Sequence, residues 1–123
     1  MKFICYLFIP VLLFPAVVIA DPADILDVDI KAERDSRYSF SVTVGHADSG
    51  WEHYADRWEI LAPDEQFIAA RTLRHPHVNE PEFTRTLGYL PIPEEITAVI
   101  IRAHCSRDGY GGKTLSVSLP QGE

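Results

Sequence analysis

Cysteine is scarce in this 123-residue sequence, which contains only Cys5 and Cys105. Cys5 lies in an apolar leader, so the rest of the chain keeps a single cysteine. One cysteine cannot form an intramolecular disulfide, even in an oxidising compartment. The fold must therefore be stabilised by its core, and about 100 residues after the leader suffice for one compact domain.

Basic residues are also few, because 11 Lys and Arg stand against 18 Asp and Glu and the net charge is −7. Apart from Lys2, all of these charges follow residue 20. A domain this acidic has no basic face with which to neutralise phosphates. Nucleic acid and anionic membrane surfaces are therefore disfavoured as partners, whereas cations are favoured.

The first twenty residues have the pattern of a secretory signal peptide. A positive start at Lys2 precedes an apolar run over residues 3–19, which ends in small and aliphatic residues that suit a signal peptidase. Pro10 and Pro15 interrupt the run and argue against a retained membrane anchor. Cys5 lies too early in it for lipoprotein processing. We predict that residues 1–20 are cleaved and that residues 21–123 form one periplasmic or secreted domain.

After the leader, apolar and polar residues alternate in short segments separated by turn residues, without a sustained helical period. Residues 38–44, for example, alternate Tyr, Phe and Val with Ser and Thr. The pattern predicts seven strands, at approximately residues 26–30, 38–44, 56–61, 66–73, 83–87, 96–105 and 114–119. Seven short strands predict an all-β fold, an immunoglobulin-like antiparallel β-sandwich.

Side-chain phase and proline positions add detail to this prediction. Leu26, Val28 and Ile30 share one phase and are expected to face the core. Pro91 and Pro93 are expected to keep the loop after the fifth strand out of any ladder, because proline lacks the N–H that a ladder needs.

All five histidines follow the leader, and strand directions assign them to one end of the sandwich. Successive strands alternate in direction, so the second, fourth and sixth strands all end there. The segments at that end carry every histidine and the remaining cysteine, namely His46, His53, His75, His77, His104 and Cys105. We expect these six residues to converge, and none to lie at the opposite end.

Imidazole and thiolate groups gathered at one end favour a transition-metal site. Neutral imidazole binds zinc, copper and iron, and a thiolate adds cuprous copper. Residues two apart on an extended chain point the same way, so His75 and His77 could face one ion together. We therefore predict a copper or zinc site, with iron less favoured. The nearby carboxylates could be ligands or hydrogen-bond acceptors for the imidazoles; they are Asp48, Glu52, Asp56 and Asp108.

Other roles stay open for some of these residues. A single histidine such as His46 is more often a hydrogen-bonding residue than a ligand. Cys105 shares its phase with Val99, Ile101 and Ala103, which favours a buried thiol in the core and turns His104 to the opposite face. A pair of histidines could instead sense pH.

Enzymatic alternatives find less support in the sequence. No G-x-S-x-G motif is present, which disfavours a serine hydrolase. A Cys105 nucleophile with His104 or His46 as its base is conceivable, but neighbours on a strand diverge, so it ranks below metal binding. The glycine-rich residues 108–112 link two strands and precede no helix, so they predict a hairpin loop rather than a phosphate cradle. The sequence favours a binding protein over an enzyme.

Residues 46–61, HADSGWEHYADRWEIL, resemble a segment of the superoxide reductases and desulfoferrodoxins. The resemblance implies a small immunoglobulin-like sandwich with a mononuclear iron held by four histidines and one cysteine. His46, His53 and Cys105 match three of those ligands. Asp108 stands where the family has a histidine, and the family's earliest histidine has no counterpart here.

The same region, with residues 79–83 and the glycine-rich final hairpin, is also similar to the Z subunit of the periplasmic thiosulfate-oxidation carrier complex. That resemblance implies a metal-free module that binds a protein partner. The H…W-x-H-Y-A-D-x-W and H-P-H pattern further resembles a family of small exported bacterial proteins, for which it implies no particular activity. The sequence thus predicts an exported metal-binding sandwich, with a protein-interaction module and an iron protein as the alternatives.

Overall fold

The computed structural model describes residues 7–10 and 19–121, which form seven strands and contain no helix. The all-β prediction is confirmed. The strands are β1 (Asp24–Ala32), β2 (Arg37–Gly45), β3 (Ala55–Leu61), β4 (Phe67–Thr72), β5 (Glu82–Pro91), β6 (Ala98–Cys105) and β7 (Leu115–Ser118). Among the described residues, no helix is long and apolar enough to cross a membrane.

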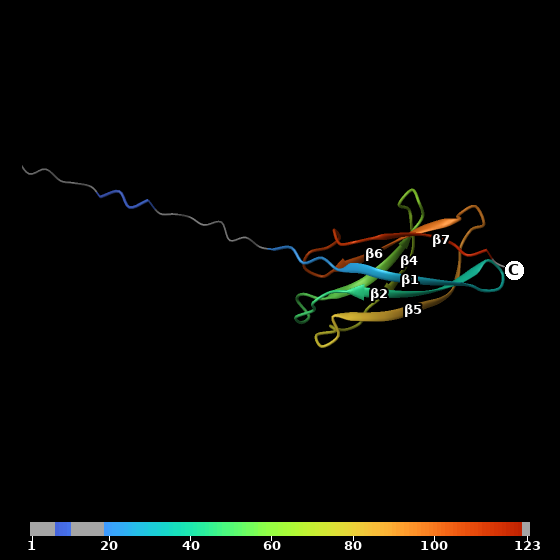
Figure 1. The fold of residues 1–123 in the computed structure, drawn as a ribbon, viewed down its shortest axis with the longest axis horizontal. Coiled ribbons are helices and arrows are strands. Elements are labelled where there is room, and N and C mark those ends of the chain that lie inside the picture. Colours follow the sequence, from blue (N-terminus) through green and yellow to red (C-terminus); the bar gives the residue numbers. More distant parts are fainter. Residues whose placement is uncertain (1–6, 11–18, 122–123) are drawn as a thin grey trace, which may run out of the picture.

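The strands form two antiparallel sheets that pack as a sandwich (Figure 1). One sheet has the order β1-β2-β5, and the other has the order β4-β3-β6-β7. Every pair of neighbouring strands is antiparallel. This arrangement agrees with the predicted immunoglobulin-like sandwich.

The core follows the period-2 alternation of the strands. Phe40, Val42 and Val44 of β2 are fully buried, and Trp58 and Ile60 of β3 face them from the other sheet. Burial alternates along β6 as well: Val99, Ile101, Ala103 and Cys105 are buried, whereas the residues between them are only partly buried. The last buried residue of β6 is Cys105. The core therefore extends to the end of the sandwich where the candidate site lies.

Two local expectations were wrong. A register shift between Ile25 and Asp27 buries Ile25 completely and leaves Leu26 38% exposed, so Leu26 does not face the core. A bulge of this kind reverses the side-chain phase without interrupting the pairing. Pro91 is the last residue of β5 and pairs with Arg37. It is tolerated there because β5 is an edge strand, where an N–H can be missing.

The two ends of the sandwich differ in what they carry. The loops after β2, β4 and β6 lie at one end, on the left in Figure 1, and β1 enters the sandwich at the same end.

Most of the predicted leader, including Cys5, lies outside the described residues. The seven strands and the buried core of the described residues all begin after residue 22.

Candidate metal centre

Two histidines and the cysteine come together where β2 and β6 end. His46 follows β2, His53 precedes β3, and Cys105 is the last residue of β6. The metal-ligating atoms of these three residues lie within 4.8 Å of one another, and all three residues are buried. Two imidazoles and a thiolate suit a transition metal. We refer to His46, His53 and Cys105 as the His2Cys group.

Asp48 orients His46 in this group. Both side chains are fully buried, and the Asp48 carboxylate accepts a hydrogen bond from His46 Nδ1. The same carboxylate accepts the backbone N–H of Ala55 at 3.0 Å and that of His77 at 2.7 Å. A carboxylate on Nδ1 leaves Nε2 as the nitrogen offered to an ion, an arrangement common around histidine ligands of metals.

His53 lies edge-on to His46 and close to a second carboxylate. The two ring centroids are 4.8 Å apart with an interplanar angle of 88°. Asp108 Oδ2 lies 3.4 Å from His53 Nε2. The hydrogen bond from the Arg107 guanidinium, followed by one from the Asp21 backbone N–H, holds the pKa of Asp108 below its ordinary value. Asp108 therefore presents a negative charge to the group.

The hairpin after β6 fixes the position of Cys105, the third residue of the His2Cys group. Cys105 N–H donates to the Gly109 carbonyl at 2.9 Å, and Gly109 N–H donates to the Cys105 carbonyl at 2.8 Å. Gly109 has a φ of 66°, a left-handed conformation that glycine adopts without strain. This tight closure returns Asp108 to the same end of the sheet, while strand alternation keeps the thiol on the buried face.

Asp21 covers the group from the N-terminal side. Its backbone carbonyl oxygen lies 2.9 Å from His46 Nε2 and 3.4 Å from His53 Nε2. Its carboxylate Oδ2 lies 3.8 and 3.9 Å from the same two nitrogens. The side chain is 46% exposed, so Asp21 separates the buried donors from solvent.

The geometry of the group is close to that of a metal site. Ligand atoms bound to zinc at about 2.0 to 2.3 Å in a tetrahedron lie about 3.3 to 3.6 Å from one another. A spread of 4.8 Å in the His2Cys group therefore needs a contraction of about 1 Å, which side-chain rotation can supply. The ion would take the space that the Asp21 carbonyl now fills, so Asp21 must move as it binds.

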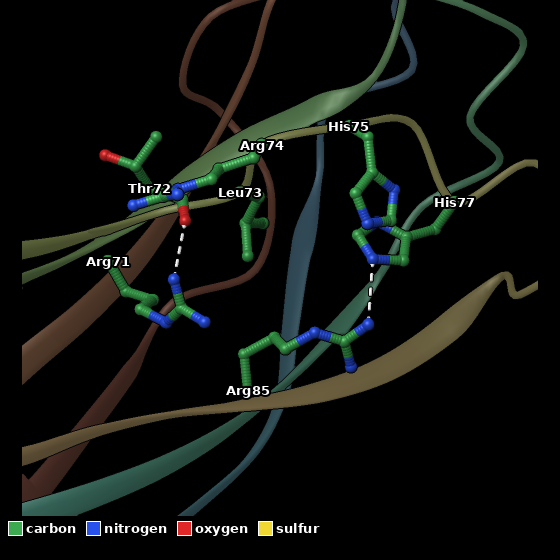
Figure 2. Close-up of a pocket in the computed structure, with 7 residues that line it drawn as sticks. All are labelled: Arg71, Thr72, Leu73, Arg74, His75, His77 and Arg85. Carbon is green, nitrogen blue, oxygen red and sulfur yellow. Dashed lines mark hydrogen bonds between the residues drawn. The ribbon is translucent and has the colours of Figure 1, made fainter.

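His75 and His77 lie apart from the His2Cys group, beside a basic pocket of about 320 Å³ (Figure 2). Arg85 Nη2 donates to His77 Nε2 at 3.0 Å, which occupies the lone pair a metal would need. Burial, then the charges of Arg85 and His75, lower the pKa of His77. Three arginines also line this pocket and repel a cation; they are Arg71, Arg74 and Arg85.

His104 faces the other side of its sheet. Its Nδ1 lies 2.6 Å from Asp56 Oδ1 and 3.2 Å from Arg57 Nη1. The neighbouring Glu59 is buried, which alone would raise its pKa, but hydrogen bonds from Tyr110 and two arginines hold the pKa below its ordinary value. These contacts form a polar network on the outer face of β3 and β6, away from the core.

The structure thus brings together three of the six residues predicted as ligands. Within residues 19–121, the group whose ligand atoms lie within 4.8 Å includes neither His75, His77 nor His104. Of the predicted carboxylates, Asp48 and Asp108 contact the group, whereas Asp56 contacts His104.

Sequence reasoning missed Asp21. The directions of the strands indicate where it lies, since the first strand must begin at the end where the second strand finishes.

Fold and site together define a β-sandwich with a buried two-histidine, one-cysteine donor group at one end. The chain is 34% identical over 100 residues, 81% of its length, to a protein of Halomicrobium mukohataei described as "Putative lipoprotein". It spans about half of that relative, because the match covers 49% of it. No family model and no solved structure matches the chain.

Proposed function

We propose that this chain is an exported metal-binding β-sandwich that holds copper or zinc through His46, His53 and Cys105. The observation that carries the proposal is the convergence of three buried donor atoms within 4.8 Å. His46 and His53 come from the connection between β2 and β3, and Cys105 comes from the end of β6. Two imidazoles and a thiolate are donors that copper and zinc accept. The carboxylates of Asp21 and Asp108 add negative charge beside them.

Two observations support export. The first twenty residues have the pattern of a cleaved signal peptide. The Halomicrobium relative carries the description of a lipoprotein, a class of exported proteins. We place the mature chain in the periplasm or outside the cell, where a metal ion is met after translocation.

The donor set favours copper, with zinc as the second choice. Two imidazoles and a thiolate in a trigonal arrangement, with a weak axial ligand, are typical of blue copper sites. The axial ligand there is often methionine, but the only methionine of this chain is Met1. An oxygen of Asp21 or Asp108 would take that position. The same oxygen would complete a tetrahedral zinc site.

Calorimetric titration of residues 21–123 with Cu(II), Cu(I) and Zn(II) tests the proposal. We expect one equivalent to bind, and we expect the Cu(II) complex to show an intense visible band from thiolate-to-copper charge transfer. The substitution His53→Gln should weaken binding by at least about tenfold, because it removes a direct ligand.

His75→Gln is the matched control, since it removes an exposed imidazole outside the group. Its affinity should equal that of the unsubstituted chain. An absence of binding would reject the proposal, and so would an equal loss of affinity in the two variants.

An iron protein is the second candidate, because the three residues that match the superoxide reductase pattern are the ones that meet in the His2Cys group. Asp108 lies 3.4 Å from His53 and occupies the place of one further family histidine. Titration of the same sample with Fe(II), followed by oxidation, tests this candidate. A thiolate-to-iron absorption band that disappears in Cys105→Ser would support it.

A further inference from the structure

Asp21 is the first residue after the predicted cleavage site, and its backbone contacts Asp108 and the two histidines of the His2Cys group. Its N–H donates to Asp108 Oδ2 at 3.0 Å. Its carbonyl oxygen lies 2.9 Å from His46 Nε2 and 3.4 Å from His53 Nε2. The peptide bond that a signal peptidase would cut therefore borders the proposed metal position.

Cleavage changes the chemistry of this nitrogen. A peptide nitrogen shares its lone pair with the carbonyl group, so it donates a hydrogen bond but does not ligate a metal. Hydrolysis adds OH from water to the carbonyl carbon of Ala20 and a hydrogen to the nitrogen of Asp21. The product is an α-amino group, whose neutral form has a free lone pair.

We propose that removal of residues 1–20 completes the metal site by making the α-amino nitrogen of Asp21 a ligand beside His46, His53 and Cys105. This inference rests on the proposed function. The amine and the carbonyl oxygen of Asp21 can close a five-membered ring with one ion, and the amine and its carboxylate can close a six-membered ring. Both oxygens already lie against the two histidines.

The chain just after Asp21 is held firmly, so the new amine stays near the three donors when Asp21 shifts to admit an ion. Ala23 is 1% exposed and belongs to the core. Ile25 N–H donates to the Lys113 carbonyl at 2.8 Å, and Lys113 N–H donates to Asp24 Oδ1 at 2.7 Å. Only two residues separate Asp21 from this anchored segment, so little conformational freedom has to be lost when it binds an ion.

The described residues of the leader contribute nothing to the core that would be lost on cleavage. Of its described residues, Leu7, Phe8, Ile9 and Ile19 are 72% or more exposed, and the strands begin at Asp24. The precursor and the mature chain therefore share the same sandwich and the same three side-chain donors. They differ in the amine and in the freedom of Asp21 to leave the space that it fills. The proposal thus couples metal binding to export.

The test compares chains that differ only at the N-terminus. The first begins at Asp21 and the second at Ala20, which moves the amine by one residue; the third begins at Asp21 with an acetylated α-amino group. Each is titrated with Cu(II) by calorimetry, and electron paramagnetic resonance counts the nitrogen ligands. We expect both modified chains to bind at least about tenfold more weakly and to lose one coupled nitrogen.

Two comparisons separate the possible results. Equal midpoints of urea unfolding without metal show that the three chains fold alike. The Asp21→Ala chain keeps the amine and loses the carboxylate, and we expect it to retain three coupled nitrogens. Equal affinity and equal nitrogen coupling in all chains would overturn this inference while leaving the proposed function intact. Failure of every chain to bind would overturn both.

Discussion

At the scale of single residues, Asp48 connects the candidate metal centre with the rest of the fold. Its carboxylate accepts from His46 Nδ1 and from the backbone N–H groups of Ala55 and His77. These partners lie after β2, at the start of β3 and in the loop after β4. One buried carboxylate thus fixes three segments at the same end of the sandwich. A buried charge is tolerated there because each oxygen is hydrogen-bonded.

The substitution Asp48→Asn tests this double role. We expect it to lower the free energy of unfolding by about 1 to 3 kcal/mol, because hydrogen bonds to a buried charged acceptor are lost or reversed. We also expect metal affinity to fall by about 10- to 100-fold, since the orientation of His46 is no longer fixed. Urea unfolding and calorimetry measure the two effects.

Asp56→Asn is the control for that substitution. Asp56 also pairs with a histidine, His104, but it lies on the outer face of the sheet. Its metal affinity should be unchanged. A loss of affinity in Asp56→Asn as large as in Asp48→Asn would show that the effect is general electrostatics rather than orientation of His46.

At the scale of elements, the sequence pattern predicted the strands well and the site in part. The alternation in β2, β3 and β6 placed Phe40, Trp58 and Ile101 in the core, because one face of each strand is buried. Strand directions predicted the end at which the histidines gather. They could not show that Arg85 of β5 binds His77, since that contact depends on the course of the loop between β4 and β5. Nor could they show Asp21, whose closest contact with the histidines is through a backbone carbonyl.

The contact between β1 and the loop before β7 depends on Gly112. A Cβ atom at this position would lie 1.9 Å from the Ala23 carbonyl oxygen, so the backbone of one segment would have to move. We expect Gly112→Ala to lower the free energy of unfolding by about 1 to 3 kcal/mol, as overpacking does. Because Asp21 lies only two residues before Ala23, we also expect weaker metal binding by the mature chain.

Gly88→Ala is the matched control for Gly112→Ala. A Cβ at Gly88 would meet only the Ser39 hydroxyl, at an ordinary 3.6 Å. Urea unfolding and Cu(II) titration of the two variants separate the local clash from a general effect of replacing glycine. Metal affinity that is unchanged in Gly112→Ala would show that the segment from Asp21 to Ala23 does not position a ligand.

At the scale of the whole molecule, the stability of the sandwich should depend on pH through a buried histidine. His77 is 6% exposed, stacks on Phe83 at 3.9 Å and accepts a hydrogen bond from Arg85. Burial first, and then the charges of Arg85 and His75, lower its pKa from the ordinary value of 6.5. The basic pocket thus keeps His77 neutral, in contrast to the acidic surroundings of the His2Cys group.

The sign of the pH effect follows from this lowered pKa. As the pH falls below 6.5, the unfolded chain protonates His77 more readily than the folded chain does, so acid favours unfolding. Above that pH both states are neutral at this residue, and its contribution to stability is fully present. We expect the free energy of urea unfolding of the metal-free chain to decrease between about pH 7 and pH 5.

The decrease should be smaller in His77→Gln, which cannot take up the proton, than in His75→Gln, which keeps the buried imidazole. Equal pH dependence in the two variants would assign the acid sensitivity to other groups.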